Sequence, residues 1–104
     1  MTEPSKKEAM ERRDPLVQEV ARELGKNVRA LRKDQKLSQE RLGYMIGTGH
    51  SRISNIERGL VVIRLSDIVK LAEALGVRLE EIIDLSAFDP VERPAADPAG
   101  HAQL

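Results

Sequence analysis

A run of polar side chains near the middle of this 104-residue chain offers hydrogen-bonding groups without negative charge. Its members are His50, Ser51, Arg52, Ser54, Asn55 and Arg58. Ile53 and Ile56 interrupt the run at a spacing of three, which predicts a short helix with one apolar and one polar face. Imidazole, hydroxyl, amide and guanidinium groups on such a face could enter a DNA major groove and meet base edges.

The sequence gives less support to catalysis or metal binding by the same residues. His50 and Ser54 are one helical turn apart and could hydrogen-bond, but no third group to orient the histidine and no oxyanion donor is evident. His50 and His101 cannot form a metal site by themselves. We therefore expect no enzyme, no metal and no cofactor. Asn55 can pair with adenine and Arg52 with guanine or a phosphate, whereas His50 alone could be an ordinary exposed histidine.

The elements around this run predict how it is positioned. Residues 38–46 carry an apolar stripe at Leu42, Met45 and Ile46, which predicts a preceding short helix capped by Ser38. Gly-Thr-Gly at residues 47–49 is a sharp corner, and Gly59 suits the residue after the second helix. Two short helices joined by such a corner form a helix-turn-helix.

Three further helices complete the predicted fold. Asp14 and Pro15 are a good helix start, and the stripe that follows runs to about residue 34. Its apolar members are Leu16, Val20, Ala21, Leu24, Val28 and Leu31. Gly25 interrupts this helix at a cost of about 1 kcal/mol relative to alanine, which indicates a neighbouring helix packed closely against it.

After Gly59 the chain is again apolar. We expect residues 60–63 to form a buried loop with Ile63 in the core. A fourth stripe follows, stopped by Gly76, and residues 78–84 favour a short fifth helix. The stripe consists of Leu65, Ile68, Leu71, Ala72 and Leu75.

Composition bounds the class of protein. Aromatic residues make up 2% of the chain and cysteine is absent, so an aliphatic helical core in a reducing cytoplasm is expected, without disulfides. No apolar run is long enough for a membrane span and no signal-peptide pattern opens the chain. We expect a flexible arm at residues 1–13, one domain at residues 14–88 and a disordered Pro/Ala/Asp tail at residues 89–104.

Charge is uneven although the formal net charge is zero. Residues 22–58 hold nine Lys/Arg against four Asp/Glu, whereas residues 65–104 hold three against eight. Local potential, rather than total charge, attracts phosphates. The unevenness could arise by chance, but the basic half coincides with the predicted helix-turn-helix.

Residues 24–83 resemble the helix-turn-helix domains of the phage-repressor and Cro type. The resemblance is carried by Leu31-Arg32, Leu37-Ser38-Gln39-Glu40, Leu42, Gly47, Ile53-Ser54, Ile56-Glu57-Arg58-Gly59 and residues 71–77. Residues 47–51 and the apolar loop look particularly like the lambda repressor's DNA-binding domain. The resemblance implies a compact five-helix fold that binds an operator as a two-fold dimer and mostly represses transcription.

The resemblance also implies roles for individual residues. Those expected to face bases are His50, Ser51, Ser54 and Asn55. Those expected to contact phosphates are Gln39, Arg52, Arg58 and Arg64. Arg32 and Glu57 match a structural ion pair. Gly43 stands where the family usually has alanine, which would loosen the contact between the two helices of the motif, and Gly49 replaces a serine cap.

Surplus apolar residues bear on assembly. Leu16, Val20, Ile82, Ile83, Leu85 and Phe88 could meet within one chain or form a homodimer interface. We expect a dimeric, sequence-specific DNA-binding regulator, in the first instance a repressor that binds a palindromic operator. The alternative is an antitoxin or another protein-interaction module with the same fold.

Overall fold

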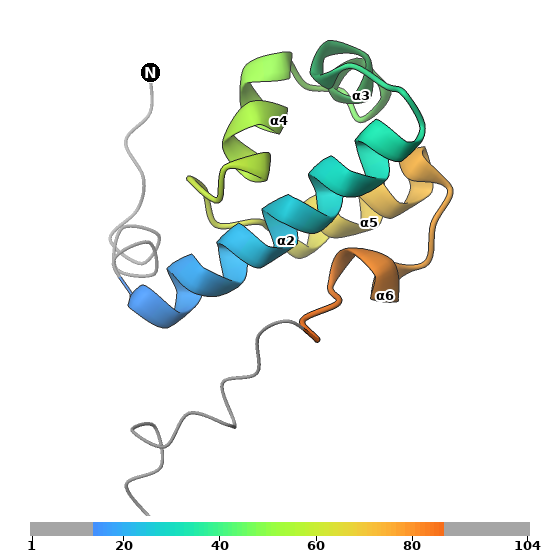
Figure 1. The fold of residues 1–104 in the computed structure, drawn as a ribbon. Helices are drawn as coiled ribbons and strands as arrows, with labels where there is room; N and C mark the ends of the chain where they lie inside the picture. Colours follow the sequence, from blue (N-terminus) through green and yellow to red (C-terminus); the bar gives the residue numbers. More distant parts are fainter. Residues whose placement is uncertain (1–13, 87–104) are drawn as a thin grey trace, which may run out of the picture.

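The computed structural model describes residues 14–86, and helices account for most of that range. The helices are α2 (Pro15–Asp34), α3 (Gln39–Met45), α4 (His50–Glu57), α5 (Leu65–Leu75) and α6 (Leu79–Ile82) (Figure 1). With five helices and no strand within residues 14–86, the all-α prediction is confirmed. The arm predicted at residues 1–13 and the tail predicted at residues 89–104 lie outside the described residues.

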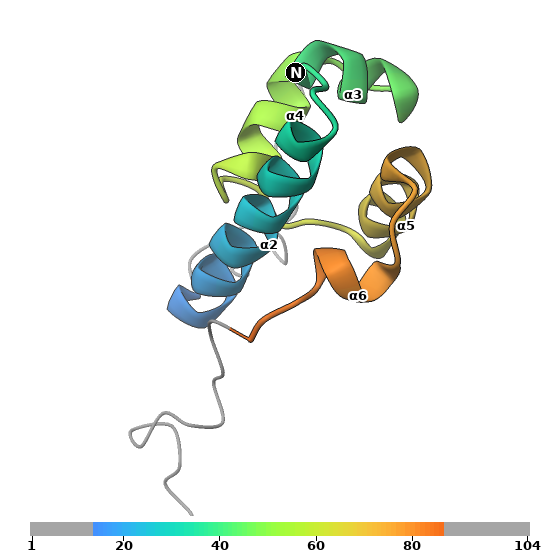
Figure 2. The same cartoon turned by 45° about the vertical axis from the view of Figure 1, so that its right-hand side comes forward.

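Helix α2 is the longest element and begins where the sequence predicts. The Asp14 carboxylate accepts a hydrogen bond from the backbone N–H of Leu16 at 2.8 Å, and Pro15 occupies the first turn. Helix α4 packs on one side of α2, and α5 and α6 lie on the other (Figures 1 and 2). None of the described helices is both long and apolar enough to cross a bilayer.

A single aliphatic core joins these helices. Its buried members are Val28, Leu42, Ile53, Ile56, Leu71, Ala72, Leu75 and Ile82. They come from each of the helices within residues 14–86, so the helix-turn-helix is held by the same core that closes the domain. Burying the apolar surface of these side chains contributes about 1.5–3 kcal/mol for each of the larger ones.

Two expectations about the α4–α5 region are wrong. Leu65 does not join the core stripe: as the first residue of α5 it is 74% exposed. Residues 60–63 do form a loop, but it is not buried as a whole. Leu60 is half exposed, and Val61 and Ile63 are half-buried against the core. The loop covers the edge of the core instead of entering it.

Polar side chains of Asn27 in α2 and of Gln35, the residue after α2, hold the ends of the last two helices. The Asn27 amide donates to the carbonyl oxygens of Ile82 and Asp84, both at 2.8 Å, and the Gln35 amide donates to the carbonyl of Leu75. Carbonyls at a helix end have no partner inside the helix, so these bonds satisfy groups that would otherwise need water. They fix α5 and α6 relative to α2.

Lys36, just after α2, has a φ of 60°, and within residues 14–86 every other positive φ belongs to a glycine. A residue with a side chain is about 1–2 kcal/mol less stable than glycine in this left-handed conformation. Glycine gives back part of that advantage, because its unfolded chain has more conformational freedom to lose on folding. We therefore expect Lys36→Gly to raise the free energy of unfolding by about 0.5–1 kcal/mol in urea titrations. Lys33→Gly, inside α2, should instead lower it by about 1 kcal/mol. A loss of stability in Lys36→Gly would contradict this reasoning.

Candidate nucleic-acid interface

Helices α3 and α4 form the helix-turn-helix at one end of the domain (Figure 1). Ser38 caps α3, since its hydroxyl accepts the backbone N–H of Arg41 at 2.9 Å. The turn reverses through Gly47, whose φ of 79° is left-handed and is therefore easily adopted by glycine.

Gly43 has the opposite effect to the one expected. A Cβ at Gly43 would lie 2.9 Å from the backbone carbonyl oxygens of Thr48 and Gly49. The bare glycine therefore allows the turn to pass close to α3, and the N–H of Thr48 donates to the Gly43 carbonyl at 2.7 Å. The prediction that Gly43 loosens the helix-turn-helix is wrong, because the space that a methyl would fill is taken by backbone.

Helix α4 has one buried and one open face. Ile53, Ile56 and Glu57 are buried, and Gly49 precedes the helix without a side-chain cap. The four residues predicted to read bases lie away from this buried face: His50 and Ser51 are exposed, and Ser54 and Asn55 are half-buried. Arg58, after the helix, is exposed as well. The structure thus places these five side chains together on the outer side of α4.

A buried ion pair supports α4 from behind. The Arg32 guanidinium donates to both carboxylate oxygens of Glu57, at 2.6 and 3.0 Å, and also to the carbonyl of Leu37 at 2.7 Å. This is the pairing that the resemblance implied for Arg32 and Glu57. It links α2, the residues before α3, and the end of α4 in one hydrogen-bonded group. Hydrogen bonding to Glu57 raises the pKa of Arg32 above its ordinary value, so the buried guanidinium keeps its charge.

Gln39, a predicted phosphate contact, belongs to the same group. Its side-chain amide donates to Oε1 of Glu57 at 3.1 Å, from the first turn of α3. Holding the amide there fixes its remaining N–H and its oxygen relative to α4. The side chain is half-buried at the edge of the candidate interface.

The other predicted phosphate contacts, Arg52 and Arg64, meet at Asp67. A terminal amino group of Arg52 lies 2.7 Å from Oδ2 of Asp67, and the backbone N–H of Arg64 donates to the same oxygen at 3.0 Å. Sequence reasoning missed Asp67. The sequence does hold a signal for this residue. Asp67 is the third residue of the predicted helix, where a carboxylate can accept the backbone N–H of the residue that precedes the helix.

Comparison with known proteins identifies this arrangement. A family model described as helix-turn-helix, of the Cro/C1 type, matches residues 28–82. The chain belongs to this family. The match spans α3, α4, α5 and α6 completely, together with the last seven residues of α2, so it includes the ion pair and the open face of α4.

Two proteins similar to this helix-turn-helix protein are named as control or controller proteins. Control protein C.BamHI of Bacillus amyloliquefaciens is 33% identical over 70 residues, which are 66% of this chain and 86% of that protein. The restriction-modification controller protein C.AhdI from Aeromonas hydrophila has a crystal structure that matches with a TM-score of 0.58 and 35% identity, over 60% of this chain and 94% of that one.

A third relative has a similar fold over more of the chain. The crystal structure of a hypothetical transcription factor, NHTF from Neisseria, matches with a TM-score of 0.59 and 32% identity, over 74% of this chain and 84% of that one. Together with the family match, these relatives support a DNA-binding helix-turn-helix transcription regulator. The open face of α4 is the part of the molecule suited to that task.

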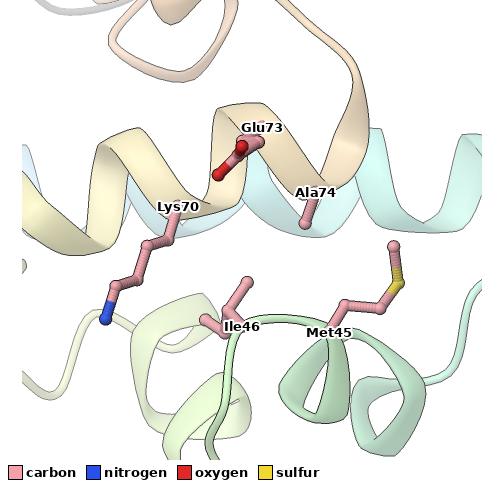
Figure 3. Close-up of a pocket in the computed structure, with 5 residues that line it drawn as sticks. All are labelled: Met45, Ile46, Lys70, Glu73 and Ala74. Carbon is pink, nitrogen blue, oxygen red and sulfur yellow. The ribbon is translucent and has the colours of Figure 1, made fainter.

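Two small hollows lie beside the helix-turn-helix. One, of about 290 Å³, lies between the end of α3 and α5 (Figure 3). It is lined by Met45, Ile46, Lys70, Glu73 and Ala74. The other, of about 220 Å³, lies between the turn and the start of α5 and has the Arg52–Asp67 pair in its wall. Within residues 14–86, no group of three or more His, Cys, Asp or Glu side chains could hold a metal ion.

The residues proposed for dimerisation have unequal positions. Leu16 and Ile83 are exposed, and Val20 and Leu85 are half-buried. Ile82 is fully buried in the core of its own chain. Of the two alternatives, packing within one chain therefore holds for Ile82, and its place in a homodimer interface is wrong. Phe88 lies outside the described residues.

Proposed function

We propose that this protein is a sequence-specific regulator that binds a palindromic operator as a homodimer and represses transcription by covering a promoter. The observation that carries the proposal is the outer face of α4, where hydrogen-bonding side chains without a carboxylate stand over a buried, ion-paired support. Ser51 and Asn55 lie one helical turn apart on that face. Such a pair can contact neighbouring bases when a recognition helix lies in the major groove.

Exposed aliphatic side chains support the dimer. Leu79 and Ile83 are one turn apart at α6, both exposed, and Leu16 is exposed at the start of α2. Burying such residues against a second copy removes apolar surface from water. In the dimer the two α4 helices would lie about 34 Å apart, one turn of DNA, which matches a two-fold symmetric site.

The protein acts by binding alone, in the cytoplasm, without catalysis. Its likeness to the restriction-modification controller protein C.AhdI makes the genes of a restriction–modification system the first promoters to test. On such a promoter, a dimer that covers about one turn or more of DNA excludes other proteins from the same base pairs.

Selection of bound sequences from random DNA tests the proposal directly. We expect the wild-type protein to enrich one palindromic sequence, with nanomolar affinity and strong salt dependence. Asn55→Ala should lose about 1–3 kcal/mol of discrimination at one base pair of each half-site. Arg58→Ala should weaken binding to all sequences alike and reduce the salt slope by about 1.

A matched variant and a transcription assay serve as controls for this test. Lys26→Ala removes a cation that is already paired with Glu23 on α2, so it should change operator affinity far less than Arg58→Ala. Transcription in vitro from the selected site should fall as protein is added. Weak binding that ignores sequence and appears only at low salt, together with tight binding to a protein ligand, would overturn the proposal in favour of an interaction module.

A further inference from the structure

Arg52 on the recognition helix is tied to a residue outside the helix-turn-helix. Its amino group lies 2.7 Å from Oδ2 of Asp67, in the first turn of α5. The Arg52 side chain is 32% exposed and that of Asp67 is 17% exposed, so the pair is screened less than one on open surface. Because Asp67 also accepts the backbone N–H of Arg64, its carboxylate is fixed in position.

The pair is embedded in a basic hollow. The turn contributes Ile46, Gly47 and Thr48 to its wall and α4 contributes Arg52, while Arg64 comes from just before α5 and Asp67 and Lys70 come from α5. Figure 3 shows Lys70 extending from α5 towards the helix-turn-helix. Three cationic side chains thus line the hollow with one carboxylate, and this carboxylate contacts Arg52.

The place of Arg52 on α4 gives this contact a consequence for DNA. With 100° between successive residues, Arg52 lies on the flank of the helix, between buried Ile56 and outward Asn55. A helix in the major groove presents its flanks to the phosphate walls of the groove. An unrestrained guanidinium at this position would be a counter-charge for the phosphates of any DNA.

We propose that Asp67 is a positioning residue that keeps Arg52 from pairing with phosphates until α4 is seated on its operator. On unrelated DNA the helix is not held at full depth, and the Arg52 charge stays neutralised by Asp67. On the operator, base contacts from Ser51 and Asn55 bring α4 deep into the groove. The guanidinium has further N–H donors, so it then reaches a phosphate without leaving the carboxylate. Asp67 in this way sets the ratio of specific to non-specific affinity.

The inference rests on the proposed function and is tested with Asp67→Asn. Asparagine keeps the size of the side chain and an oxygen that can accept the Arg64 N–H, but removes the charge that holds Arg52. Affinity for a random-sequence duplex should rise about threefold to tenfold in low salt, and the salt slope should steepen by about 0.9, as one added phosphate contact requires. Affinity for the selected operator should change less, so the specificity ratio falls.

Matched variants separate this role from a structural one and from a simple change in net charge. In an Arg52→Gln background, Asp67→Asn should no longer raise non-specific affinity. Asp84→Asn makes the same charge change after α6 and should leave both affinities unchanged. Asp67→Glu keeps the charge and should keep the specificity ratio close to that of the wild type.

Two results would overturn the inference. One is an equal loss of operator and random-sequence affinity in Asp67→Asn with a lowered Tm, which would mean that Asp67 only stabilises α5. The other is an equal effect of Asp67→Asn with and without Arg52. Failure of the proposed function would look different, because the wild-type protein itself would then enrich no sequence.

Discussion

Glu57→Ala is expected to lower the free energy of unfolding by about 3–5 kcal/mol. The substitution leaves the Arg32 guanidinium buried without the carboxylate to which it donates at 2.6 and 3.0 Å. It also removes the acceptor of the Gln39 amide. Because the total stability of a small domain is about 5–15 kcal/mol, this variant should melt far earlier than the wild type or fail to fold. Chemical denaturation followed by circular dichroism measures the difference.

The expected loss of stability comes from breaking the Arg32–Glu57 pair and leaving one buried charge without its partner, not from the absence of either side chain as such. A double variant, Arg32→Met with Glu57→Leu, removes both charges together and should recover much of the loss, since no uncompensated charge remains buried. Glu23→Ala breaks an exposed pair on α2, in which Lys26 is 71% exposed, and should cost at most about 1 kcal/mol. A loss in Glu57→Ala as small as that in Glu23→Ala would contradict the burial of the pair.

The elements that bury a periodic apolar face were predictable from sequence. Helix α2 begins at the Asp14–Pro15 signal, and α3 is capped by Ser38, since both local hydrogen bonds are encoded within three residues. The place of Gly25 against a neighbouring helix was predicted too, because an interior glycine is costly unless something occupies the space of its side chain. Local rules apply where the decisive contact is local.

Tertiary contacts decided the features that were mispredicted. Leu65 fits the α5 stripe by spacing, yet the first residue of a helix can point past the edge of the core, and here it does. For Ile82 the sequence leaves two alternatives open, because an apolar stripe cannot say whether its own core or a partner covers it, and the structure buries it in its own core. The effect of Gly43 was predicted from the alanine that the family usually has at this position. How close the backbone of Gly49 comes to Gly43 depends on how tightly the turn closes, which the sequence does not show.

In the candidate interface, too, the features set by local spacing could be predicted, and those set by tertiary contacts could not. The outward side of α4 follows from the spacing of Ile53 and Ile56, since a helix that buries those two turns Ser54 and Asn55 towards the opposite side. The Arg52–Asp67 pair could not be predicted, because 15 residues and the α4–α5 loop separate the partners. Its existence depends on how α5 is placed against the turn.

Gly25→Ala is expected to destabilise the domain by about 1–3 kcal/mol, although alanine is the better helix former by about 1 kcal/mol. A Cβ at Gly25 would lie 2.7 Å from the Glu57 carbonyl oxygen and closer still to that of Ile56. Both neighbours are backbone atoms at the end of α4, so they can move only if α4 moves. Urea titration should show the loss, and operator affinity should fall because α4 carries the DNA-reading face.

The sign of the Gly25→Ala effect separates packing from propensity. Ala30 is exposed on the same helix, and Ala30→Gly should cost about 1 kcal/mol from propensity alone. If space between α2 and α4 were loose, Gly25→Ala would stabilise the domain by a similar amount, which would contradict the close approach. Because α2 touches α4 just where Glu57 meets Arg32, the close approach and the ion pair reinforce each other. Gly25→Ala should therefore lose much of its cost in a variant that already lacks the Arg32–Glu57 pair.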